Sequence, residues 1–86
     1  MDRRSVFPGF DALGEGRREV VAGLVRERRR LGLSQTEVAA RMATSQSAVA
    51  RLEAGAADLR VSTLQRYAAA VGCDLEWRVA RREGAS

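Results

Sequence analysis

The sequence predicts an all-α fold of four to five short helices in a single domain. Apolar residues recur at helical spacing through most of residues 15–72. Two segments, Ser34–Glu37 and Ser62–Gln65, match the S-x-x-E/Q pattern of a capping box, which marks the start of a helix. Three glycines follow apolar stretches, where a helix stop belongs: Gly32, Gly55 and Gly72. The 86 residues have room for one domain with a modest core.

Composition narrows the classes of protein. The formal net charge is +4, which favours a polyanionic partner. All 15 basic residues are arginine, a bias that GC-rich codons explain. Neither a run of 18 apolar residues nor a signal peptide is present, so no membrane association is expected. The single Cys73 fits a reducing cytoplasm. Because the chain has no His and no nucleophile or carboxylate constellation, we expect no metal, no cofactor and no enzymatic activity.

Residues 1–14 show no sustained period and are predicted to be an N-terminal tail. Its two aromatic residues, Phe7 and Phe10, are unusual for a purely solvated segment. The alternatives for this tail are disorder, packing back on the domain, and docking on a partner.

The first predicted helix runs from Glu15 to Leu31 and turns one apolar side inward. That side consists of Val20, Val21, Leu24, Val25 and Leu31. The second helix starts after Ser34, in a capping box closed by Glu37, and ends near Ala43. Its buried side is predicted to be Val38, Ala39 and Met42.

The third predicted helix has Ser45 as its cap, and the fourth follows a loop over residues 56–60. Val49 and Leu52 face inward from the third helix. The apolar stripe of the fourth helix is Leu64, Tyr67, Ala68 and Val71. Two short helices joined by a tight turn, the second polar on its outer face, form the helix-turn-helix plan. Plain helical bundles contain such pairs too, so spacing alone leaves both alternatives open.

Two sequence segments favour the first alternative. Gly32–Ala39 reads G-L-S-Q-T-E-V-A, and Ser45–Gly55 reads S-Q-S-A-V-A-R-L-E-A-G. Together they resemble the Xre/HipB family, the lambda-repressor-like class of helix-turn-helix regulators, over about residues 17–80. The family pattern usually has an apolar residue where Thr44 stands.

The resemblance implies roles for individual residues. Gln46 and Ser47 at the start of the third helix are expected to read DNA bases, with Ala48 against a thymine methyl. Arg51, one turn later, is expected to reach bases or phosphate. Phosphate contacts are expected at the two helix starts, from Ser34, Gln35, Thr44 and Ser45. Arg28 and Glu53 match a structural ion pair. The alternative for Gln46 and Ser47 is that they only solvate a helix start, and capping alone is equally open for Ser34. Specific roles are not expected for Arg41, Arg60 and Arg66.

Residues 73–82 alternate between apolar and polar, which predicts a β-strand. A lone strand needs a partner for its backbone amides, so we expect pairing with a two-fold copy, as in the HipB- and HigA-type antitoxins that the chain resembles. The dimer interface would then contain Leu75, Trp77 and Val79, with residues 83–86 as a tail. The competing interpretation is a fifth helix, with Trp77 in the core.

The expected function is sequence-specific repression of transcription from a palindromic operator in double-stranded DNA by a cytoplasmic homodimer. The chain is expected to be the antitoxin of a type II toxin–antitoxin pair that autoregulates its operon, with a cognate toxin as its protein partner. The alternative is a stand-alone phage-like or housekeeping repressor with no toxin partner.

Overall fold

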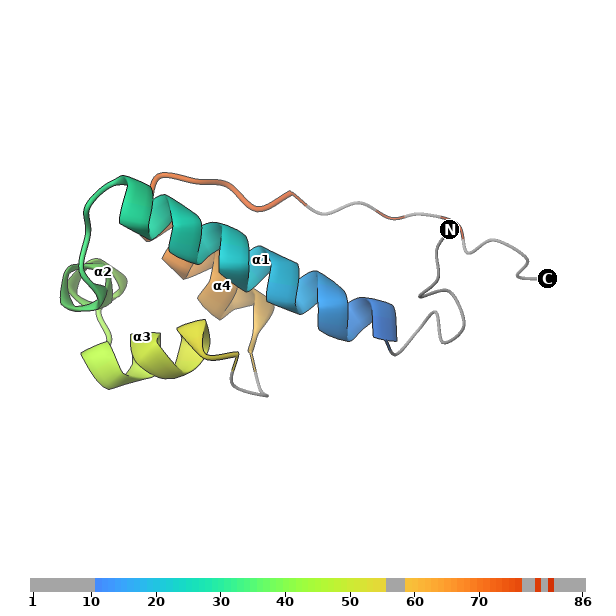
Figure 1. The fold of residues 1–86 in the computed structure, drawn as a ribbon, viewed down its shortest axis with the longest axis horizontal. Helices are drawn as coiled ribbons and strands as arrows, with labels where there is room; N and C mark the ends of the chain where they lie inside the picture. The colour runs from blue at the N-terminus through green and yellow to red at the C-terminus, as the bar shows by residue number, and fades with distance from the viewer. Residues whose placement is uncertain (1–10, 56–58, 77–78, 80, 82–86) are drawn as a thin grey trace.

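The computed structural model describes residues 11–55, 59–76, 79 and 81, and the side chains from residue 16 onward. It contains four helices among the described residues and no strand there, which confirms the all-α prediction. The helices are α1 (Asp11–Arg30), α2 (Gln35–Met42), α3 (Gln46–Glu53) and α4 (Val61–Ala70), drawn in Figure 1. None of them is long and apolar enough to cross a membrane.

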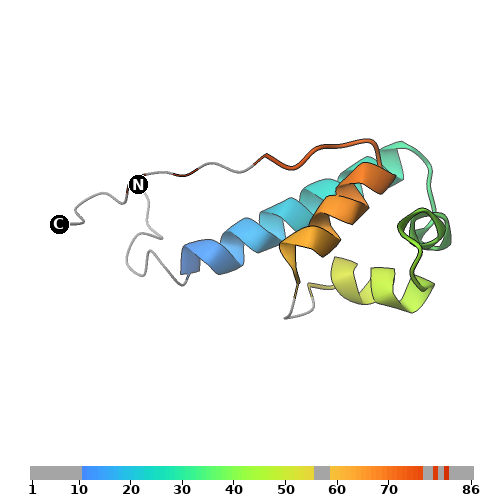
Figure 2. The same ribbon diagram turned by 180° about the vertical axis from the view of Figure 1, so that it is seen from behind.

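The four helices pack around one core. In Figures 1 and 2, α4 lies beside α1, whereas α2 and α3 are at one end of this pair. Helix α2 contacts α3 and α4, and α1 contacts the same two helices. The buried apolar side chains that fill the centre are Val21, Leu24, Val38, Ala39, Met42, Val49, Leu52, Leu64, Tyr67, Ala68, Ala70 and Val71. They include every apolar residue predicted to face inward from the second, third and fourth helices.

Helix α1 differs from its prediction at both ends. It begins at Asp11, four residues before the expected start at Glu15, so part of the predicted tail is helical. Its N-terminal half projects beyond the other three helices (Figure 1). At the other end α1 stops at Arg30, and Leu31 is 43% exposed. Placing Leu31 on the buried side was therefore wrong: it lies in the turn, next to Gly32, which has a φ of +71°.

The starts of α2 and α3 follow the sequence prediction. Ser34 Oγ accepts a hydrogen bond from Glu37 N at 3.0 Å, and Ser34 N donates to Glu37 Oε1 at 2.7 Å, which completes the capping box. Ser45 Oγ accepts from Ala48 N at 3.1 Å at the start of α3. Between the two helices, Ala43 is left-handed with a φ of +58°, a conformation that strains a residue carrying a Cβ. The turn is thus closed by backbone geometry at Ala43 and by a cap at Ser45.

The predicted second capping box does not form. Helix α4 begins at Val61, with Arg60 at the N-cap position and no side-chain cap hydrogen bond. Because the helix starts there, Ser62 already has helical geometry and cannot cap it. The pattern was correct about the presence of a helix and wrong about its first residue.

Two arginines tie the ends of α2 and α4 together. Arg41 is in the last turn of α2, and Ala70 is the last residue of α4. The Arg41 guanidinium donates to the carbonyl oxygen of Ala70 at 2.8 Å. Arg66 of α4 donates in return to the carbonyl oxygen of Met42, the last residue of α2. Carbonyls at a helix end lack intrahelical partners, and cations are favourable there. Each helix therefore satisfies a carbonyl at the end of the other.

The segment after Gly72 forms neither a helix nor a strand in its described residues, 73–76, 79 and 81. Cys73 and Leu75 are half-buried against the core of their own chain, whereas Val79 is fully exposed. Trp77 lies outside the described residues. The fifth helix is not formed in the described part of this segment, and pairing with a second chain stays a prediction.

Candidate DNA-binding surface

Helix α3 has one buried side and one polar side. Val49 and Leu52 are buried, whereas Gln46, Ser47 and Arg51 are exposed. Ala48, the fourth residue predicted to read bases, is half-buried at the first turn. The polar side chains expected to contact bases therefore lie together on the outer side of one short helix.

The residues predicted to contact phosphate lie at the N-terminal ends of α2 and α3. The hydroxyl groups of Ser34 and Ser45 are occupied as caps, and Ser45 Oγ also lies 3.2 Å from Ser47 Oγ. Thr44 is exposed, and its amide nitrogen donates to Ala39 O at 2.9 Å. Two helix N-termini with unpaired amides give this region a positive potential.

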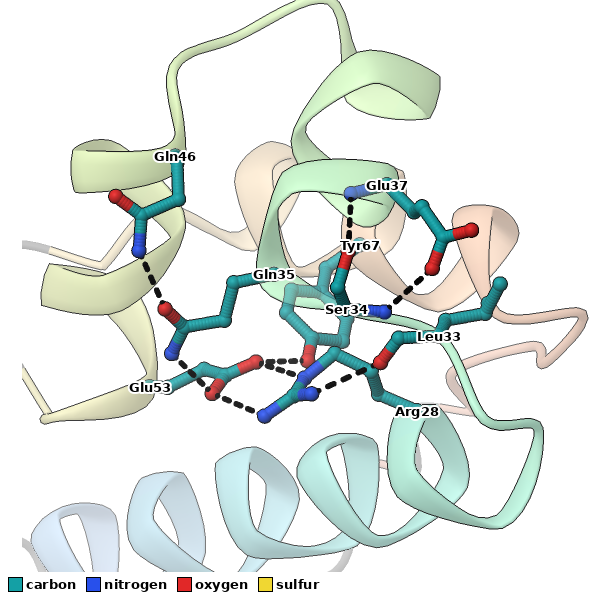
Figure 3. A network of polar contacts seen from close by, with 8 residues as sticks. All are labelled: Arg28, Leu33, Ser34, Gln35, Glu37, Gln46, Glu53 and Tyr67. Carbon is teal, nitrogen blue, oxygen red and sulfur yellow. Dashed lines mark hydrogen bonds and ion pairs between the residues drawn. The ribbon is translucent and has the colours of Figure 1, made fainter.

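A chain of hydrogen bonds joins the two helix starts to the core, as Figure 3 shows. Gln46 Nε2 donates to Gln35 Oε1 at 2.6 Å, and Gln35 Nε2 donates to Glu53 Oε1 at 2.9 Å. A carboxylate can only accept, so Glu53 fixes which end of the Gln35 amide points toward it. The Gln35 oxygen is then left to hold Gln46. The structure thus links a predicted base-reading residue to a predicted phosphate-binding one.

Glu53 is the centre of this network (Figure 3). Arg28 Nε lies 2.6 Å from Glu53 Oε2, and the Arg28 NH2 nitrogen donates to Glu53 Oε1 at 2.9 Å, so the ion pair is bidentate. The other terminal nitrogen of Arg28 donates to Leu33 O at 2.9 Å. Tyr67 Oη donates to Glu53 Oε2 at 2.5 Å. Helix α3 carries this carboxylate, and α1, α4 and the start of α2 each contribute a side chain that contacts it.

The electrostatic environment keeps each member of the network in the protonation state that the contacts need. Burial raises the pKa of Glu53, but hydrogen bonds from Arg28, Tyr67 and Gln35 lower it by more than burial raises it. The net pKa therefore lies below its ordinary value. Burial, followed by the hydrogen bond to Glu53, raises the pKa of Tyr67. At neutral pH, Glu53 is therefore an ionised acceptor and Tyr67 a protonated donor.

Three residues make polar contacts that the sequence did not predict. Tyr67 was assigned only to an apolar stripe, although a buried tyrosine hydroxyl usually has a hydrogen-bond partner, and this rule could have indicated one. For Arg41 and Arg66 no specific role was expected, because nothing in a linear sequence shows which carbonyl a long side chain reaches across the fold.

Comparison with known proteins matches these features to a family. Residues 24–78, more than half of the chain, match the family model described as Helix-turn-helix. The chain is 43% identical over 69 residues to Antitoxin HigA1 of Mycobacterium tuberculosis, in the strains CDC 1551 / Oshkosh and ATCC 25618 / H37Rv.

The aligned region is 80% of this chain and 46% of each relative, so the chain spans about half the length of the curated relatives it matches. No solved structure matches the chain significantly. The chain belongs to the helix-turn-helix family, and its resemblance to Xre-type regulators is confirmed.

Proposed function

We propose that this chain is a sequence-specific DNA-binding repressor that reads the major groove with α3. The observation that carries the proposal is the exposed polar side of α3. Gln46 and Ser47 lie there next to two helix N-termini, and Arg51 follows in the last turn of the same helix. A glutamine amide suits adenine and an arginine fork suits guanine at the edges of the major groove. The hydrogen bond from Gln46 to Gln35 fixes one of these readers before DNA binds.

Selection from random DNA duplexes, followed by a gel shift with the selected sequence, tests this function. Gln46→Ala combined with Arg51→Ala should weaken specific binding by at least tenfold, since each good bidentate base contact discriminates by about 1–3 kcal/mol. Gln65→Ala, an exposed glutamine on α4, is the matched control and should bind as the wild type does. Equal binding by the double variant and the control would contradict the assignment of α3.

The same chain is proposed to act as an antitoxin that represses its own operon from the cytoplasm. This rests on the relatives named Antitoxin HigA1, to which 80% of the chain aligns. Co-expression with the protein encoded by the adjoining reading frame tests it. Copurification and restored growth are the expected results. A chain that binds its operator but neither binds nor neutralises that protein would instead be a stand-alone repressor.

We propose further that the repressor acts as a two-fold dimer on a palindromic operator. Two α3 helices one DNA turn apart, about 34 Å, would read two half-sites. The full exposure of Val79, in a segment without an intrachain strand partner among the described residues, supports pairing with a second copy. Sedimentation of Trp77→Asp is the test, because an aspartate should prevent the expected interface. A variant that remains dimeric would place the interface elsewhere.

A further inference from the structure

A groove lies beside the C-terminal end of α3. Its volume is about 550 Å³, and it lies between α1 and the last residues of α3, including Glu53, Ala54 and Gly55. Its apolar lining comes from Val21, Ala22 and Val25 of α1, and its basic lining from Arg18, Arg26 and Arg29. The groove thus combines apolar side chains with cationic ones.

The three arginines are available to a ligand. All three are exposed, and within the described part of the chain none of their guanidinium groups has a hydrogen bond or an ion pair. The acidic group that lines the groove, Glu53, is already neutralised by its bidentate pair with Arg28. An uncompensated positive potential therefore remains at the groove, which selects an anionic ligand.

The groove also continues the proposed DNA-binding surface. Glu53 lines the groove and accepts the hydrogen bond from Gln35, which in turn holds Gln46. Helix α3 has eight residues and is about 12 Å long, close to the roughly 12 Å width of the major groove. If the start of α3 lies near the phosphates of one strand, its end lies near those of the other.

We propose that this groove binds the sugar–phosphate backbone of the second DNA strand, with Arg18, Arg26 and Arg29 as phosphate ligands. The proposal rests on the DNA-binding function proposed above and assigns α1 a part in it. The apolar lining suits the deoxyribose faces, and the guanidinium forks suit phosphate oxygens. An acidic segment of a protein partner is less favoured, because the groove is continuous with the residues expected to contact DNA.

Salt-dependent binding to the duplex selected by the wild-type chain tests the groove. Each of Arg18→Gln, Arg26→Gln and Arg29→Gln should weaken binding to all sequences alike and reduce the slope of log K against log salt by about 1. The loss of affinity between 50 and 200 mM salt should then be about fourfold smaller for each variant. Arg30→Gln is the matched control, because Arg30 is on α1 but outside the groove and pairs with Glu27 at 3.0 Å.

A second pair of variants tests the lining itself. Ala22→Glu adds a negative charge to the groove and should weaken DNA binding at least tenfold more than Ala22→Gln, which has the same size without the charge. Thermal unfolding followed by circular dichroism should be similar for both, since Ala22 is exposed.

The outcomes separate this proposal from the function on which it rests. A wild-type chain that selects no sequence overturns both. A wild-type chain that binds specifically, with groove variants whose salt slopes equal that of Arg30→Gln, overturns the groove alone. Groove variants that bind DNA normally but lose the protein encoded by the adjoining reading frame also overturn it and assign the groove to that partner.

Discussion

The α2–α3 unit and the segment after Gly72 both have strong sequence patterns. Only the residues of the α2–α3 unit make the contacts that their pattern predicts within the described part of this chain. In residues 34–53 the caps, the buried residues and the ion-pair acceptor Glu53 all contact groups of the same domain. In residues 73–82 the alternation predicts a strand, yet the described part forms none. A capping box can be satisfied within four residues, whereas a strand needs a neighbour that a single chain need not supply.

The largest expected effect is a loss of stability in the α2–α3 unit. Glu53→Ala should lower the free energy of unfolding by about 3 kcal/mol, because it leaves the buried Arg28 unpaired and removes the acceptor of Tyr67. Urea denaturation measures the change. A loss below about 0.5 kcal/mol would show that the network is not what holds this unit together.

Acid should weaken the same network by protonating its centre. The pKa of Glu53 is lowered from the ordinary value of 4.5 on folding, so its stabilising contribution is present above that pH and disappears as the pH falls through the lower folded pKa. Glu37, whose pKa is lowered by the backbone hydrogen bond from Ser34, adds in the same direction. Unfolding free energy measured from pH 7 to pH 2 should therefore decline below about pH 4.5. A smaller decline in Glu53→Gln is expected, and an equal one would exclude Glu53 as a source.

Two serines in similar sequence patterns should behave differently. Ser34→Ala removes a hydroxyl that accepts from Glu37 N and should cost about 1 kcal/mol of stability. Ser62→Ala, within α4, removes no cap and should be neutral or slightly stabilising, because alanine is the better helix former. Differential scanning calorimetry of the two variants makes the comparison. Equal losses would mean that Ser62 caps α4 in solution.

A smaller gain is expected at the turn between α2 and α3. Ala43 has a φ of +58°, so Ala43→Gly relieves a strain of about 1–2 kcal/mol while adding roughly 0.5–1 kcal/mol of backbone entropy cost. The net gain should be about 0.5 kcal/mol by urea denaturation. A clear loss would indicate that the Ala43 side chain contributes packing that outweighs its backbone strain.

The smallest effect is expected in the C-terminal segment. Val79→Ser should change the unfolding free energy of the isolated chain by less than about 0.5 kcal/mol, because Val79 makes no buried contact there. Leu75→Ser should cost more, since Leu75 packs against the core. Repeating both measurements over a range of protein concentrations sharpens the contrast. A loss for Val79→Ser that grows with concentration would reveal a dimer stabilised by this residue.

Local physics explains which features the sequence predicted. The caps at Ser34 and Ser45 and the inward faces of α2 and α3 depend on neighbours within one or two helical turns, and the structure agrees with them. The starts of α1 and α4 were misplaced, because several residues can begin a helix and packing decides among them. The groove and the contacts of Arg41 and Arg66 depend on how helices cross, which residue spacing does not encode.

The contact between Arg66 and Met42 has a consequence for genetics. Arg66 lies on α4, outside the predicted DNA-contact residues, yet it donates to the carbonyl of Met42, the last residue before the turn into the proposed base-reading helix. A screen for mutants that fail to repress should therefore recover substitutions at Arg66 alongside those at Gln46. Substitutions at Arg66 would change the orientation of α3 and leave its DNA-facing side chains unchanged. We expect second-site substitutions in the turn to restore repression in the Arg66 mutants. They should not restore it in mutants that lack the Gln46 amide.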